Sequence, residues 1–239
     1  MLTALWADKQ GNIFDAPGYE AVGRNGRDAY RLQPADVIPA PEGTEVMYLP
    51  DRPAMGARGG RILPVGGGRL AVAAVLPAGY TRLYLPAYRP GRTAHILPLY
   101  GYTAAALYRD ALYVAAVRSD DNSKWNPLRY NTGDLKRRVR AVQRELGDNR
   151  IVGQLAHCSL TWHCCTAQNL FYRRWEAGIP VSPACNANCL GCISRQPAEC
   201  CPSPQDRLAF TPTPGEIAAV GCYHLQTAPE AIISFGQGC

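Results

Sequence analysis

The sequence predicts an α/β fold in its C-terminal part, preceded by a β-rich N-terminal domain. Three observations carry this prediction. Residues 1–130 contain short apolar runs separated by proline and glycine, which is typical of short strands. Residues 131–178 contain a helical pattern with a basic face. Residues 179–239 predict a strand, a helix and a strand in that order, as in a parallel βαβ unit.

The N-terminal domain begins with a predicted hairpin. Residues 4–8 and 12–15 flank Lys9-Gln10-Gly11, a plausible turn. Further apolar runs predict strands of a small sheet or barrel at residues 69–75, 81–85 and 111–117. The run Gly66-Gly67-Gly68 lacks the Gly-Lys-Ser/Thr ending and the helix of a phosphate loop, so we expect a turn there.

Residues 134–146 predict an amphipathic helix in the middle segment. Its apolar positions recur at helical spacing, with Asp134 as the predicted cap and Gly147 as the predicted end. The opposite face carries Lys136, Arg137, Arg138, Arg140 and Arg144. A basic face is one way to bind RNA, but no aromatic platform accompanies these charges. We therefore expect a solvated surface helix, and a nucleic-acid partner is unsupported.

The C-terminal segment predicts the opening of an α/β domain. Residues 179–183 predict its first strand, and the long proline-rich loop 193–211 precedes a helix. Thr213-Pro214-Gly215-Glu216 starts that helix, with threonine as cap and glutamate at the capping-box position. Residues 231–235 predict a buried second strand that ends in Gly236-Gln237-Gly238. Loops at the carboxyl ends of such strands carry the chemistry of these folds.

The placement of the cysteines argues against an exported disulfide scaffold. All ten lie between Cys158 and Cys239, whereas such a scaffold spreads its cysteines through a small domain. Thiols crowded into one region of a cytosolic chain bind metal or do redox chemistry there. No apolar run approaches the ~20 residues of a membrane span, and the N-terminus lacks the pattern of a signal peptide. We expect a soluble, cytoplasmic protein with no membrane partner.

Three of the cysteines form one tight group. Cys185, Cys189 and Cys192 have the spacing C-x3-C-x2-C just after the predicted first strand. Thiolates favour zinc, copper(I) or iron–sulfur clusters. Structural zinc takes four ligands, usually as two separated pairs, and two-cluster ferredoxins use C-x2-C-x2-C spacing. The spacing therefore favours a cluster held by three thiolates, with its fourth iron open to a small molecule.

The motif and its setting resemble those of the radical S-adenosylmethionine (radical SAM) enzymes. The resemblance implies that residues 179–239 begin a partial (β/α) barrel. It implies a [4Fe-4S] cluster held by Cys185, Cys189 and Cys192, with S-adenosylmethionine (SAM) bound to the open iron. It also implies an enzyme that cleaves SAM reductively to a 5′-deoxyadenosyl radical, which abstracts hydrogen from a substrate. A low-potential electron donor similar to flavodoxin or ferredoxin would reduce the cluster. The substrate is not identified by the sequence.

The resemblance also implies a glycine-rich segment that contacts the SAM amino group. Its residues are Ser234, Phe235, Gly236, Gln237 and Gly238. The chain departs from the family pattern at Gly191, where an aromatic residue is usual, and it stops at Cys239, before the usual acidic residue and the remaining strands. We therefore expect the N-terminal portion of a longer polypeptide, with an incomplete and inactive catalytic site.

Other potential metal ligands lie outside the triplet. They are His157, Cys158, His163, Cys164, Cys165, Cys200 and Cys201. These residues could hold an auxiliary cluster or a zinc ion. Adjacent cysteine side chains diverge, however, which favours buried or capping thiols around the cluster pocket. We expect Cys222 to be a buried small residue, and the isolated His95 and His224 to be structural.

Two other functions stay open beside the radical SAM hypothesis. In a zinc-binding module, Cys189 and Cys192 would join Cys200 or Cys201, and the basic helix would contact nucleic acid. In an iron–sulfur electron-transfer protein, the cluster would pass electrons without SAM. Metal content separates the first alternative from the leading hypothesis, and SAM binding separates the second.

Overall fold

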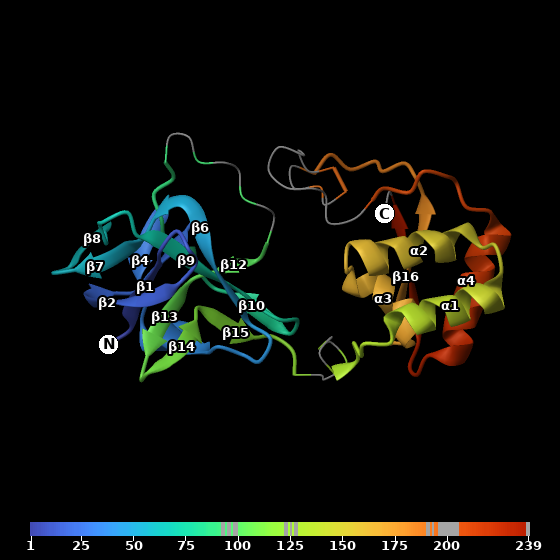
Figure 1. Cartoon of the computed structure of the whole chain (residues 1–239), viewed down its shortest axis with the longest axis horizontal. Helices are drawn as coiled ribbons and strands as arrows, with labels where there is room; N and C mark the ends of the chain where they lie inside the picture. The colour runs from blue at the N-terminus through green and yellow to red at the C-terminus, as the bar shows by residue number, and fades with distance from the viewer. Residues whose placement is uncertain are drawn as a thin grey trace. The chain divides into compact units, whose positions relative to one another are not determined.

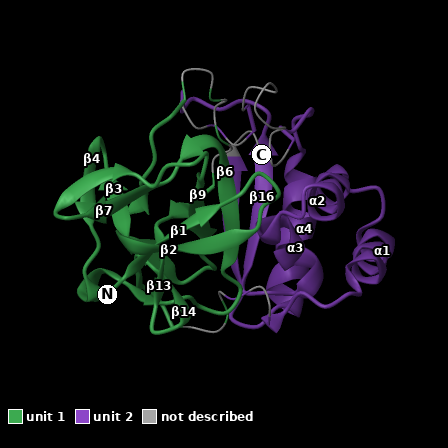
Figure 2. Ribbon diagram, turned by 60° about the vertical axis from the view of Figure 1, so that its left-hand side comes forward, with its two compact units in different colours: residues 1–125 green, residues 126–239 purple. Residues whose placement is uncertain are grey.

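A computed structural model describes residues 1–91, 94, 97, 100–121, 124, 126, 129–189, 192, 194, 195 and 206–237 (Figure 1). The chain forms two compact units, Met1–Trp125 and Asn126–Cys239, which we call unit 1 and unit 2 (Figure 2). Unit 1 is built from strands, whereas unit 2 holds the described α-helices and a small sheet. The chain thus mixes α and β structure and is β-rich, as predicted. No described helix has the length and apolar character needed to cross a bilayer.

Unit 1 consists of short antiparallel strands. Their bounds are β1 (Thr3–Ala7), β2 (Ile13–Glu20), β3 (Val22–Asn25), β4 (Asp28–Arg31), β5 (Ile38–Pro39), β6 (Glu45–Pro53), β7 (Met55–Arg58), β8 (Arg61–Pro64), β9 (Leu70–Val75), β10 (Tyr80–Arg82), β11 (Leu85–Pro86), β12 (Tyr102–Thr103), β13 (Ala105–Tyr108), β14 (Ala111–Val114) and β15 (Ala116–Arg118), with a 3-10 helix at Pro34–Asp36. The largest sheet has the order β5-β14-β13-β1-β2-β7-β8, and β9 pairs with β1, β6 and β12. Two smaller sheets are β10-β15 and β11-β3-β4.

The predicted N-terminal hairpin is confirmed. β1 pairs antiparallel with β2, with Leu5 opposite Asp15 and Ala7 opposite Ile13. Gly11 has φ +89° in the connecting turn, a left-handed conformation that glycine adopts without strain. The three glycines of residues 66–68 also have positive φ and connect β8 to β9. A strand rather than a helix follows them, so this run is a turn and not a phosphate loop.

Two of the other predicted strands are divided in the structure, because their halves pair with different partners. Residues 69–75 correspond to β9 alone. Residues 81–85 contribute to β10 and β11, which belong to different sheets, and residues 111–117 contribute to β14 and β15. Alanine is the most frequent buried residue in each hydrophobic cluster of unit 1, for example Ala73 and Ala106. The neighbours of these alanines pack closely around them, so larger side chains would not fit at these positions.

Unit 2 contains the predicted βαβ order. Its elements are α1 (Leu135–Leu146), α2 (Arg150–Thr161), α3 (Cys165–Tyr172), β16 (Glu176–Ser182), α4 (Pro214–Thr227) and β17 (Ile232–Gln237). β16 and β17 are parallel, with Ala177 opposite Ile233 and Ile179 opposite Phe235. α4 connects them. Among the described residues this is a two-stranded sheet, so the partial barrel implied by the resemblance stays a prediction.

Helices cover both faces of this sheet. A Cβ added at Gly221 of α4 would meet side-chain atoms of Ile233 and Ile179 at 3.1 and 3.8 Å, so α4 lies on the face that carries these isoleucines. A Cβ added at Gly178 of β16 would meet Thr166 Cγ2 at 3.0 Å, so the start of α3 lies on the opposite face. Helices thus pack on both faces of the sheet. The absence of a side chain at Gly221 and at Gly178 allows α4 and α3 to approach it closely.

The helices within residues 131–178 belong to the same unit as residues 179–239, which differs from the predicted division into a linker and a core. α1, α2 and α3 contribute Val142, Leu155 and Leu170 to one hydrophobic core with β16 and α4. The apolar faces of α1, α2 and α3 are buried against β16 and α4, so these three helices need the rest of unit 2 to cover them. The boundary between the units accordingly lies at residues 125/126.

Asp134 begins α1 as predicted, but its side chain does not cap the helix. The carboxylate accepts no hydrogen bond from the first backbone amides. It pairs instead with Arg137 and with Arg138, whose Nε lies 2.9 Å from Oδ1. Hydrogen bonds from the Thr132 hydroxyl and from these arginines hold the pKa of Asp134 well below its usual range. Part of the predicted basic face is therefore engaged by a carboxylate.

Candidate functional site

The loop with the three cysteines begins where β16 ends. β16 stops at Ser182, whose hydroxyl accepts a hydrogen bond from the Ala184 amide at 3.1 Å. Cys185 and Cys192 are half-buried, Cys189 is exposed, and none of these thiols forms a disulfide. The loop thus leaves the carboxyl end of a parallel strand, which is the edge where α/β folds place their ligands.

The three thiols do not converge in the structure. In the described part of the chain, no group of three or more His, Cys, Asp and Glu side chains is close enough to hold a metal ion. Residues 183–189 form neither helix nor strand. Backbone hydrogen bonds of regular structure therefore do not oppose a rearrangement that gathers the thiols, and metal binding supplies free energy for such ordering. The donor set fits a cluster in chemistry and spacing, without a preformed ligand geometry.

Cys192 contacts two polar side chains. Its Sγ lies 3.4 Å from Ser194 Oγ and 3.9 Å from Arg207 Nη2. Arg207 Nη2 also lies 3.5 Å from Ser194 Oγ. Hydrogen bonds from the side chain and backbone of Ser194, reinforced by the Arg207 guanidinium, lower the pKa of the Cys192 thiol. Because the thiolate is the metal-binding form of cysteine, these contacts favour Cys192 as a ligand.

Residues 206–208, which we call the strap, return the chain to α2 after the cysteine loop. Asp206 Oδ2 lies 2.6 Å from His157 Nε2 and accepts a hydrogen bond from Trp162 Nε1 at 3.0 Å. These hydrogen bonds, with that from Trp162 first, lower the pKa of the Asp206 carboxyl. Leu208 is only 2 % exposed. Arg207 therefore lies between two anchored neighbours.

A cavity of about 260 Å³ lies against the two parallel strands. Its lining comes from β16, β17, α2 and the start of α3, and includes Gln154, Cys158, Cys164, Thr166, Gly178, Pro180, Ser234, Phe235 and Gly236. The Gln154 amide donates to Cys158 Sγ at 3.5 Å and to the Asp206 carbonyl oxygen at 3.2 Å. Gln154 thus links the cavity wall to the strap by a hydrogen bond. The volume is close to the lower end of the ~300–1,000 Å³ of ligand pockets.

Three residues of the predicted SAM-contacting segment line this cavity. They are Ser234, Phe235 and Gly236 of β17. Gln237 is the last residue of β17, and Gly238 lies outside the described residues. Phe235 is 65 % exposed, so most of its surface is not covered by unit 2. The carboxyl halves of both parallel strands thus border one cavity, and the cysteine loop follows one of them.

The cysteines upstream of the triplet are not gathered into a second metal site in the described residues. Cys158 is 7 % exposed, and burial raises the pKa of its thiol. Cys164 lines the cavity beside Cys158, whereas Cys165 at the start of α3 is exposed. Cys200 and Cys201 lie outside the described residues. Among the residues that are described, Cys158 and Cys164 contribute to packing and to the cavity wall.

Isolated residues of α4 give a mixed outcome. His224 is fully buried, and burial lowers its pKa, which agrees with a structural role. Cys222, which the sequence predicts to be buried, is exposed. The prediction is wrong because the core of unit 2 receives Val220 and Tyr223 from α4, and Cys222 falls on the opposite side of the helix. His95 lies outside the described residues.

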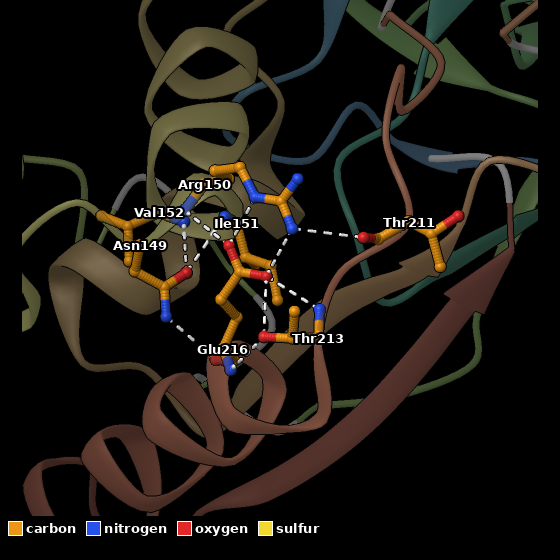
Figure 3. Close-up of polar contacts among 7 residues, drawn as sticks. All are labelled: Asn149, Arg150, Ile151, Val152, Thr211, Thr213 and Glu216. Atoms are coloured by element: carbon orange, nitrogen blue, oxygen red, sulfur yellow. Dashed lines mark hydrogen bonds and ion pairs between the residues drawn. The ribbon is translucent and has the colours of Figure 1, made fainter.

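A polar cluster joins the first turns of α2 and α4 (Figure 3). Glu216 accepts a bidentate pair of hydrogen bonds from Arg150, each 2.7 Å long. Glu216 also completes the predicted capping box with Thr213. Asn149 caps α2 through the Ile151 amide at 3.0 Å and donates to the Glu216 carbonyl oxygen at 2.9 Å. α2 is thus tied to α4 at one end and to the strap at the other.

No family model matches the chain, and neither curated proteins nor solved structures show significant similarity to it. The resemblance to radical SAM enzymes therefore depends on the cysteine motif and on its place in the βαβ unit.

Proposed function

We propose that the chain is a radical SAM protein in which Cys185, Cys189 and Cys192 are the ligands of a [4Fe-4S] cluster. One observation carries the proposal. Three free thiols follow the carboxyl end of β16, and a cavity lined by both parallel strands lies in the same βαβ unit. When bound, a cluster with an open iron supplies an electron to SAM.

The residues of the cavity would hold the ligand. Ser234, Phe235, Gly236, Gln237 and Gly238 would contact the SAM amino group. The absence of a side chain at Gly178 keeps the cavity open, because a Cβ there would meet Thr166 Cγ2 at 3.0 Å. A flavodoxin- or ferredoxin-like donor would supply the electron in the cytoplasm. The substrate would be selected by elements outside residues 179–239.

The zinc-binding module is the alternative at the same cysteines. Structural zinc needs a fourth cysteine, histidine or carboxylate ligand. Among the described residues, Cys192 contacts the hydroxyl of Ser194 and the guanidinium of Arg207, whereas Cys200 and Cys201, the further ligands of that alternative, lie outside the described residues. The cavity beside β16 and β17 in turn favours a small-molecule ligand over an electron carrier without SAM.

Low-temperature electron paramagnetic resonance (EPR) tests the proposal. The anaerobically reconstituted, dithionite-reduced protein should give a [4Fe-4S]⁺ signal that changes shape when SAM is added. Changing Cys185, Cys189 and Cys192 together to alanine should abolish the signal, whereas Cys222→Ala, which removes an exposed thiol of α4, should leave it intact. A zinc-loaded protein without a signal would establish the zinc module. A signal that does not change when SAM is added would indicate an electron carrier or an incomplete SAM site.

A further inference from the structure

Arg207 presents a cation to the thiol of Cys192 from a fixed position. Its Nη2 lies 3.9 Å from Cys192 Sγ and 3.5 Å from Ser194 Oγ. Its Nε is buried and has no hydrogen-bond partner among the described residues, so part of the guanidinium is withdrawn from water. The strap holds the backbone on both sides of Arg207, through the contacts of Asp206 with α2 and the burial of Leu208.

The charge of Arg207 is not neutralised by a described carboxylate. Its neighbour Asp206 directs its carboxylate to His157 and Trp162 instead. No ion pair involving Arg207 occurs among the residues that the structure describes. A half-buried, uncompensated cation interacts more strongly with a nearby anion than a solvated cation does. Among the described residues, the group within its reach that becomes an anion on metal binding is the thiol of Cys192.

A hydrogen bond or a positive charge at a ligand sulfur has a known effect on an iron–sulfur cluster. It stabilises the reduced form, which carries one more negative charge, and so raises the reduction potential. The equilibrium concerned moves one electron from a low-potential donor to the cluster, and no bond is made or broken. Ser194 adds a second hydrogen-bonding group at the same sulfur, 3.4 Å away.

We propose that Arg207, together with Ser194, raises the reduction potential of the bound cluster through Cys192. Arg207 acts through another residue and is therefore a positioning residue, not a catalytic one. The inference rests on the proposed function, because it requires that Cys192 is a cluster ligand. It makes Cys192 the ligand through which the strap and α2 act on the redox properties of the site.

Potentiometric titration of the reconstituted chain, followed by EPR without SAM, tests the inference. Arg207→Met should lower the equilibrium constant for one-electron reduction about tenfold, which is ~59 mV in midpoint potential. Arg207→Lys keeps the charge and should restore most of the difference. Ser194→Ala should lower the potential by less than Arg207→Met. Arg195→Met removes an exposed cation from the same loop and should leave the potential unchanged.

Each outcome decides between the two proposals. A wild-type potential in Arg207→Met, or an equal shift in Arg195→Met, overturns the inference, because a specific contact with Cys192 would then not be responsible. If Arg207→Met assembles no cluster, an unchanged potential in Ser194→Ala overturns it. A wild-type protein without any cluster overturns the proposed function, and the inference with it. If the cluster responds to SAM but its potential does not change in the Arg207 and Ser194 variants, the inference is overturned and the proposed function is not.

Discussion

Replacing Asn149 tests how strongly the tie between α2 and α4 stabilises unit 2. Its Oδ1 accepts hydrogen bonds from the amides of Ile151 and Val152 at 3.0 and 3.4 Å, and its Nδ2 donates to the Glu216 carbonyl oxygen at 2.9 Å. Loss of an N-cap side chain costs about 1 kcal/mol, and loss of a hydrogen bond between two helices costs about 1 kcal/mol more. Asn149→Ala should therefore lower the free energy of unfolding by ~2 kcal/mol.

Asn149→Ser separates the two contributions. Serine keeps the cap but does not reach the Glu216 carbonyl, so this variant should lose ~1 kcal/mol. The assay is urea denaturation followed by the helical band of circular dichroism, because all four described α-helices belong to unit 2. Asn12→Ala, in the turn between β1 and β2, is the control and should leave this transition unchanged. Wild-type stability in Asn149→Ala, or equal losses in the serine and alanine variants, would refute the reasoning.

Three further perturbations address the core, the strap and the cavity. Burial lowers the pKa of His224 below 6.5, so the unfolded chain takes up the proton at a higher pH than the folded chain does. The free energy of unfolding should therefore fall as the pH drops below 6.5, and denaturant titrations of His224→Leu should lack that part of the pH dependence. Leu208→Ala should cost ~3 kcal/mol at a buried site and speed limited proteolysis of the cysteine loop, and unchanged cleavage would contradict the anchoring role of the strap. Gly178→Val should abolish the effect of SAM on the EPR signal while iron content is retained, because its side chain would fill the cavity toward Thr166; Gly153→Val, where a Cβ has open space, is the control.

The βαβ unit could be predicted because its signals are local. The capping box of Thr213 and Glu216 marks the start of α4 within one residue, and the apolar run at residues 231–235 marks β17. α2 carries a comparable signal, with Asn149 as cap before apolar residues at helical spacing, although its pattern is weaker than that of α1. The divided strands of unit 1 could not be predicted, because each division depends on which distant strand supplies the partner.

The three candidate cysteine ligands could be named from spacing alone, whereas their surroundings could not. Asp206 contacts His157 and Trp162 across 49 and 44 positions of the chain, and Gln154 reaches the same residue across 52. Such contacts exist only after α2 has packed against the rest of unit 2. A sequence pattern reports on residues a few positions apart, so the contact of Arg207 with Cys192 could be found only from the fold.

The strap also bears on the order in which unit 2 assembles. α1, α2, α3 and β16 follow one another closely in the chain, whereas β17 reaches β16 only after a long excursion. Contacts distant in sequence form late, and closing a long loop in two stages lets each stage gain its own contacts. We expect the contiguous elements to assemble first, the strap to dock next, and β17 to pair last. The thiols would then lie beside β16 before β17 has paired with it, and a cluster bound as we propose would help the sheet to complete.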